Sequence, residues 1–182
     1  MPWSNNKRLS GLLIACVLLT GLMATAAPFL PGRRQVPAEV LSLTGLKQIR
    51  VDVEPHSRLL GSGGLSIVQT RRNIEKLLVD GGLTLSSKPD TPTLQVVMLT
   101  SAHPAHREVV AVTYHLSLHQ SVAIERLDRI VLVPTYTLVN GELVPVDDVL
   151  QNVQNVLPSM VLQFLSRIET ADRAQASENA NE

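Results

Sequence analysis

Histidine is the residue type in this sequence with the greatest capacity for chemistry, because imidazole binds metal ions and transfers protons near neutral pH. The chain has five histidines. His103 and His106 lie in a turn-rich stretch, and His115 and His119 follow on one face of an expected strand. Four strand residues separate those two side chains by roughly 13 Å, so one metal ion cannot bind both without further ligands. We expect solvated turn and sheet-face histidines, with His103, His106 and His115 as weak candidate metal ligands.

The other motifs do not predict catalysis. Residues 61–64 (GSGG) precede an expected helix, as phosphate-binding loops do, but they lack the Lys-Ser/Thr ending of such loops. The Gly-x-Ser-x-Gly and Ser-x-x-Lys motifs of serine hydrolases do not occur, nor does the His-Glu-x-x-His motif of zinc hydrolases. Asp147 and Asp148 are expected to cap a helix. The sequence therefore predicts no catalytic residue, no enzymatic activity and no cofactor.

Charge and composition exclude a nucleic-acid binder. Lysine plus arginine number 16, as do aspartate plus glutamate, so the formal net charge is zero, whereas nucleic-acid affinity comes largely from cationic contacts to phosphate. Aromatic residues make up 3%, too few for a base-stacking platform. Hydrophobic residues make up 45% of the 182 residues, enough for the core of one ordinary domain and too many for a disordered chain.

The N-terminus reads as an export signal. Residues 1–26 have the features of a secretory signal peptide: the basic Lys7 and Arg8, an apolar stretch over 12–23, and a small-residue cleavage motif ending at Ala26. Cleavage there would remove Cys16, the only cysteine of the chain. The exported domain would then fold without disulfides.

Two alternatives to cleavage remain. Residues 9–30 carry no charge and are long enough to span a bilayer as an uncleaved inner-membrane anchor. Residues 13–16 (LIAC) look like a bacterial lipobox, which would place a lipid on Cys16. All three interpretations predict a periplasmic or otherwise exported protein. The uncleaved anchor and the lipid on Cys16 would also attach it to the membrane.

The remainder divides into a linker, a domain and a tail. Residues 27–38 form a linker containing proline, glycine and arginine, and residues 174–182 are small and polar, typical of a disordered tail. The folded domain is therefore expected over 39–173, and it contains no internal repeat.

The first half of the domain predicts a strand followed by a helix. Apolar and charged residues alternate over 49–54, which indicates a half-buried strand. Ser66 followed by Gln69 fits a capping box at the start of a helix over 66–80. Two glycines, 81–82, end the helix because glycine adopts the left-handed conformation without a steric penalty.

The middle of the chain predicts strands. A short strand is expected at 83–85, and the apolar run 94–99 is typical of a central strand covered on both faces or nearly so. A turn over 101–107 precedes a long strand, in which apolar residues alternate with polar ones from 110 to 119.

Another strand is expected over 130–138, after a turn at 126–129. Pro134 lies inside this strand and cannot donate a ladder hydrogen bond, so the strand belongs at a sheet edge or a bulge. Asn140-Gly141 predicts a tight turn after it. The last element is a helix over 147–172 with a continuous apolar stripe, kinked at Pro158 but remaining one helix.

The element order β-α-β-β-β-β-α predicts an α+β fold. We expect a two-layer sandwich in which two helices pack on one face of a mostly antiparallel sheet of four to five strands. The opposite face of the sheet should be more polar and more open.

This layout resembles that of small exported bacterial envelope proteins. The resemblance is to the outer-membrane assembly lipoprotein LptE, the N-terminal domain of TolB and exported proteins of unknown function. It rests on the strand–loop–helix stretch 49–82, the long strand 113–126 (TYHLSLHQSVAIER), and the Asn140-Gly141 turn leading into the 149–168 helix. It covers most of 45–170 as a layout without a diagnostic motif. It implies two helices on a mixed four-stranded sheet and a role in envelope assembly or partner binding, and it transfers no functional residue.

Two functions follow from these expectations. The first is a non-enzymatic envelope protein, an adaptor or assembly factor that binds an unidentified envelope protein through its open sheet face or its Pro134-bearing edge strand. The alternative is a small-ligand or metal-binding domain that uses the histidine-bearing sheet face, with His103, His106 and His115. The sequence leaves the oligomeric state open.

Overall fold

The computed structural model describes residues 36–56, 60–61, 64–103 and 105–180. The chain splits into two compact units, Met1–Gln35 and Val36–Glu182, and the described residues belong to the second. The expected signal peptide, its alternatives at 9–30 and Cys16, and most of the expected linker lie outside the described residues.

The observed elements follow the expected order, with one short additional helix at the start. They are α2 (Ala38–Leu41), β1 (Gln48–Pro55), α4 (Ile67–Asp80), β2 (Thr84–Leu85), β3 (Thr93–His103), β4 (His106–Ile124), the 3₁₀ turn η1 (Glu125–Leu127), β5 (Arg129–Pro145), the 3₁₀ turn η2 (Val146–Asp148) and α5 (Val149–Asn179).

The strands form one five-stranded sheet in the order β2-β1-β3-β4-β5. β1 is parallel to both β2 and β3, whereas β3, β4 and β5 form an antiparallel meander. The α+β class is confirmed, but the expectation of a mostly antiparallel sheet is wrong, because the sheet is mixed. The physical reason is α4: a helix between β1 and the next strands returns the chain to the same end of the sheet, which makes those strands parallel.

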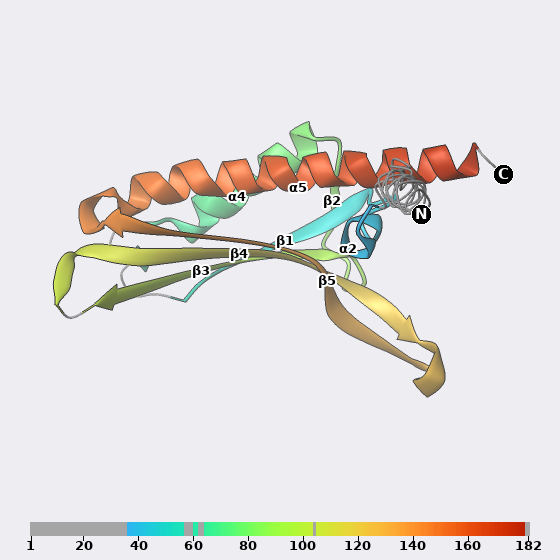
Figure 1. Ribbon diagram of the computed structural model, residues 1–182, viewed down its shortest axis with the longest axis horizontal. Helices are drawn as coiled ribbons and strands as arrows, with labels where there is room; N and C mark the ends of the chain where they lie inside the picture. The colour runs from blue at the N-terminus through green and yellow to red at the C-terminus, as the bar shows by residue number, and fades with distance from the viewer. Residues whose placement is uncertain (1–35, 57–59, 62–63, 104, 181–182) are drawn as a thin grey trace, which may run out of the picture. The chain divides into compact units, whose positions relative to one another are not determined.

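The core lies between one face of this sheet and the long helices. Figure 1 shows α4 and α5 on the same side of the sheet. Alternate residues of β1, β3 and β4 are buried in one apolar cluster with residues of both helices. Its fully buried members with the largest side chains include Ile49, Leu94, Met98, Tyr114, Leu116, Leu118, Ile74, Leu78 and Phe164.

The ends of α4 follow part of the expected capping chemistry. The Ser66 hydroxyl accepts a hydrogen bond from the backbone N–H of Gln69 at 3.3 Å. The Gln69 side chain donates to Asn73 Oδ1 instead of returning to Ser66, so the second half of the capping box is absent. At the other end Gly82 has φ +89°, the left-handed conformation expected of a helix-terminating glycine.

Gly81, the residue after α4, lies against Leu165 of α5, and we expect Gly81→Ala to destabilise the domain by about 1 kcal/mol. A Cβ atom at this position would lie 2.6 Å from both Cδ atoms of Leu165, so the contact between the helices must adjust. Urea unfolding of the single variants and of Gly81→Ala/Leu165→Ala measures the coupling between the two positions. Gly82→Ala is the matched control: it meets no atom within 4 Å and suffers backbone strain alone. A Gly81→Ala variant as stable as the parent would contradict this contact.

The meander strands are longer than their sequence patterns indicated. β3 reaches His103 and β4 begins at His106, so the expected turn over 101–107 is much shorter. The expected tight turn at Asn140-Gly141 is wrong: Asn140 pairs with Tyr114 and Gly141 with Thr113 inside β5. Pairing with a long neighbouring strand outweighs the local turn preference of the dipeptide, because strand preference depends strongly on context.

The C-terminal helix is also longer than expected. α5 is one helix with Pro158 inside it, as expected, but it continues to Asn179, into the stretch assigned to the tail. Asp147 lies in η2 and Asp148 stands at the N-cap of α5, so both are at the positive end of the helix as expected, but the Asp148 side chain makes no capping hydrogen bond. Near the far end of α5, Asp172 Oδ1 accepts a hydrogen bond from the Gly45 N–H at 2.8 Å. This bond holds the late turns of α5 to the segment after α2.

Within the described part of the chain, none of the helices combines the length and the apolar character needed to cross a bilayer.

Candidate functional site

The candidate metal ligands are spread along the meander. His103 and His106 are register partners where β3 meets β4, and His115 lies nine residues further along β4. Nine strand residues span roughly 30 Å, so His115 is far from the other two. His106 Nδ1 lies 4.0 Å from the carboxylate of Glu108. Among the described residues, no group of three or more His, Cys, Asp and Glu side chains could hold a metal ion.

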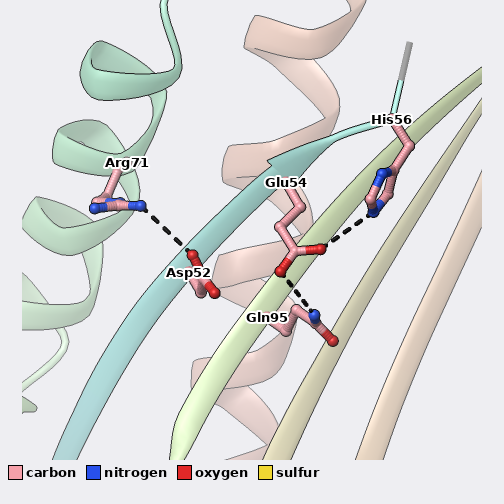
Figure 2. Close-up of polar contacts among 5 residues, drawn as sticks. All are labelled: Asp52, Glu54, His56, Arg71 and Gln95. Carbon is pink, nitrogen blue, oxygen red and sulfur yellow. Dashed lines mark hydrogen bonds and ion pairs between the residues drawn. The ribbon is translucent and has the colours of Figure 1, made fainter.

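The open face of the sheet, opposite the helices, carries a polar cluster on β1 and β3. Figure 2 shows its members, with Glu54 at the centre: Gln95 Nε2 donates to Glu54 Oε1 at 3.2 Å, and His56 Nε2 lies 3.1 Å from Glu54 Oε2. Arg71 reaches from α4 to Asp52 of β1, with 3.5 Å between Nη2 and Oδ1. These ion pairs are largely exposed, and exposed pairs contribute little to stability. They connect β1 to β3 and to α4.

A cleft of about 470 Å³ lies beside this cluster, where β2 ends. Its walls come from residues 49–51 of β1, from Leu85 of β2 and the two serines after it, 86–87, and from Arg71 and Glu75 of α4. Both signs of charge line it, together with serine hydroxyls, so it does not select one class of ligand.

A buried hydroxyl ties the sheet to α5. Tyr114 of β4 donates to Asn152 Oδ1 at 2.5 Å, and Asn152 Nδ2 donates to Glu142 Oε2 at 2.6 Å. Burial, reinforced by the negative charge of Glu142, raises the pKa of Tyr114 to about 12. A phenol with so high a pKa stays neutral at physiological pH, so this chain of hydrogen bonds is a structural link.

A group of exposed apolar side chains lies on an extension of the sheet, here called the arm. β3 begins at Thr93, which lies opposite His119 of β4. The β4–β5 hairpin from Gln120 to Val133 therefore extends past the start of β3 and consists of two strands only. Figure 1 shows this part of the hairpin bending away from the rest of the sheet. The turn at its tip is η1, followed by Asp128 in the left-handed conformation at φ +48°.

The arm is apolar on both faces. Directly opposite residues share a face, so Ala123 and Ile130 lie together on the open-face side, as do Ser121 and Leu132. Val122 and Val131 lie together on the helix side. Ile130 is 75% exposed and Leu132 is 62% exposed. Two-stranded hairpins are only marginally stable in water, and an arm with two apolar faces is typical of a surface that another molecule covers.

The base of the arm is braced. The ladder is irregular between Leu118 and His119, which pair with Tyr136 and Pro134, so Thr135 is an extra residue in β5. Thr135 Oγ1 donates to Gln120 Oε1 at 3.2 Å, and Ser42 Oγ donates to the Thr135 carbonyl at 3.2 Å. Pro134 therefore lies both in the edge strand and beside a bulge, which confirms its predicted position.

Sequence reasoning placed Pro134 correctly but missed the arm. The signal was present: residues 130–133 (IVLV) are apolar without alternation, which predicts cover on both faces. The expected strand over 130–138 includes this stretch but does not indicate that a third strand is missing beside it.

Comparison with known proteins gives only distant likenesses. No protein-family model matches the sequence, and no curated protein matches it. Among solved structures, a minor lipoprotein from Acinetobacter baumannii is 13% identical with a TM-score of 0.36, covering 69% of this chain and 94% of its own. The rare lipoprotein B from Shewanella oneidensis is 13% identical with a TM-score of 0.27, covering 73% and 99%. An uncharacterized lipoprotein B from Nitrosomonas europaea is 10% identical with a TM-score of 0.27, covering 80% and 92%. These neighbours are bacterial lipoproteins, and at such TM-scores the likeness carries no further argument.

Proposed function

We propose that this chain is an exported, non-enzymatic envelope protein, an adaptor or assembly factor that binds another protein through the arm. The observation that carries the proposal is the exposure of Ile130 and Leu132 on a two-stranded extension that is apolar on both faces. In this proposal the domain is a two-layer sandwich whose helices cover one face, so that the arm and the open face remain available to the partner.

The energetics favour a covered arm. Burying a side chain such as leucine or isoleucine contributes about 1.5–3 kcal/mol. A partner that covers both faces of the arm would gain a part of this amount at each of Val122, Ile130 and Leu132, in proportion to the exposed fraction of the side chain. The fully buried core of a protein interface is more apolar than its rim, and these side chains suit such a core.

The tip of the arm favours a protein partner over a bilayer. Glu125, Arg126, Asp128 and Arg129 are exposed at the tip, beside the exposed Leu127. Insertion of the tip into a membrane would bury four charged side chains, each at a cost of about 2.5–3.5 kcal/mol or more at the bilayer centre. A groove in a protein can cover the apolar faces and leave the charged tip in water.

Substitutions on the arm test this function. We expect Ile130→Lys and Leu132→Lys each to reduce the amount of partner captured from envelope extracts at least tenfold, because each buries a charge in the interface. Leu162→Lys is the matched control, since Leu162 is an exposed leucine on α5, far along the chain from the arm. Quantitative mass spectrometry of the captured proteins gives the measurement. The arm is not the binding surface if the same proteins are captured equally by the parent and by both arm variants.

Export is part of the same proposal and has its own test. The mass of the N-terminal peptide of the protein isolated from cells distinguishes cleavage after Ala26, an uncleaved anchor over residues 9–30, and a lipid on Cys16. A soluble cytosolic product that keeps residues 1–26 would contradict export.

A further inference from the structure

The part of β5 beyond the bulge, Thr135–Pro145, is a second unusual surface, here called the edge segment. β5 is the last strand of the sheet, so its outer side pairs with no other described strand, although Ser42, after α2, contacts the carbonyl of Thr135, the first residue of the edge segment. Exposed edge strands are normally protected by charged side chains. The edge segment has one charged residue, Glu142, and its carboxylate accepts the Asn152 amide at 2.6 Å. On its open face, Leu143 is 78% exposed and Val139 is 62% exposed.

Two prolines bound the edge segment at nearly equal distances from its middle residue. Pro134 precedes it and Pro145 ends it, and neither residue can donate a ladder hydrogen bond. The proline-free stretch between them is centred next to Asn140. A strand that pairs antiparallel with its own copy about a two-fold axis needs such a symmetric window, because each end of the strand lies opposite the other end of the copy.

The side chains match when the axis passes through Asn140. In this register Val139 lies opposite Gly141 of the copy, which has no side chain, and Leu143 lies opposite the smaller Thr137. On the helix side Tyr136 lies opposite Val144, an aromatic–β-branched pair of the kind that stabilises antiparallel sheets. Glu142 lies opposite Leu138, so like charges do not meet. The two Asn140 amides face one another at the axis and can exchange hydrogen bonds.

We propose that the edge segment pairs antiparallel with the edge segment of a second copy, about a two-fold axis through Asn140. The two five-stranded sheets then continue as one, and about ten interchain backbone hydrogen bonds form along the segment. A second copy of this chain fits the edge segment because, in the register through Asn140, the side chains that lie opposite one another match in size, polarity and charge. The dimer leaves the arm outside the paired segment, so it is compatible with the proposed function and does not depend on it.

The association state of the full chain in mild detergent tests the dimer. Sedimentation equilibrium should give twice the monomer mass, with dissociation on dilution. Asn140→Lys and Asn140→Glu should each weaken dimerisation at least tenfold, because like charges then meet at the axis. Mixing the two variants should restore the dimer, which a loss of folding could not produce. Ile130→Lys, on the arm, should dimerise like the parent. A chain that is monomeric at every concentration, or one whose dimer is unaffected by Asn140→Lys, would overturn the proposal.

Cysteine cross-linking tests the register. In a Cys16→Ser background, Asn140→Cys should form a disulfide-linked dimer under mild oxidation, since the two positions are directly opposite. Thr137→Cys should not, because it lies six residues out of register with its own copy, roughly 20 Å along the strand. The pair Thr137→Cys/Leu143→Cys should cross-link again. Cross-linking of Thr137→Cys alone, or failure of Asn140→Cys in a chain that dimerises, would refute this register.

Discussion

Replacement of Phe164 by alanine is expected to destabilise the domain by about 3–5 kcal/mol, the cost of leaving a cavity in place of a buried aromatic ring. Phe164 is 0% exposed and lies in the middle of α5. Its ring packs against Tyr136 of β5, with 5.8 Å between ring centroids and 45° between ring planes. The substitution therefore removes both apolar burial and the contact that joins the longest helix to the edge strand.

Leu162→Ala is the control for this prediction. Leu162 lies on the same helix two residues earlier but is 56% exposed, so we expect a loss of less than about 1 kcal/mol. Urea unfolding followed by far-ultraviolet circular dichroism measures both variants. Equal losses for the two variants would show that α5 does not pack on the sheet through Phe164.

The second large effect is a loss of stability at alkaline pH. Because the pKa of Tyr114 is raised from 10.0 to about 12 in the folded domain, the unfolded chain ionises first as the pH rises. The contribution of Tyr114 to the free energy of unfolding is complete below about pH 10. It is lost as the pH rises from about 10 to about 12, and the total loss is about 2–3 kcal/mol. Burial raises the pKa of Tyr136 as well, so both tyrosines contribute to this loss.

Tyr114→Phe separates the two contributions. At pH 7 the variant should lose about 1 kcal/mol, because Asn152 Oδ1 no longer receives the phenol hydrogen bond. Between pH 10 and pH 12 the variant should lose less stability than the parent, and the remaining decrease is the part due to Tyr136. Unfolding free energies measured from pH 7 to pH 12 give the comparison. Parallel pH profiles for the parent and Tyr114→Phe would contradict the burial of an un-ionised phenol at this position.

Local chemistry was enough to predict most elements of this fold. The alternation over 49–54, the Ser66 cap and the glycines after Asp80 each have a local cause, and the structure contains the strand, the cap and the left-handed Gly82. The position of Pro134 also followed from one property, the missing N–H. Such features are predictable because the residues that determine them are neighbours in the sequence.

The features that depend on distant residues were not predictable in this way. Whether β1 pairs parallel to β3 depends on where α4 returns the chain, and the local pattern of β1 is the same in either case. Asn140-Gly141 favours a turn locally, yet pairing with β4 keeps both residues in a strand. The arm was missed for a similar reason, since it exists only because β3 begins opposite His119 and leaves the hairpin beyond without a third strand.

The mixed sheet also has a consequence for the order of folding. The meander consists of hairpins between successive segments, whereas β1 must wait for β3, as the pairing of Arg50 with Thr93 illustrates. Contacts between distant segments form slowly, because a long loop has to close first. During synthesis, β1 could pair only at Gln48 and Ile49, with β2, until β3 has emerged. We therefore expect amide protons of β4 and β5 to gain protection before those of β1 in pulse-labelled hydrogen exchange. Simultaneous protection of all strands would instead indicate that the sheet assembles in one step.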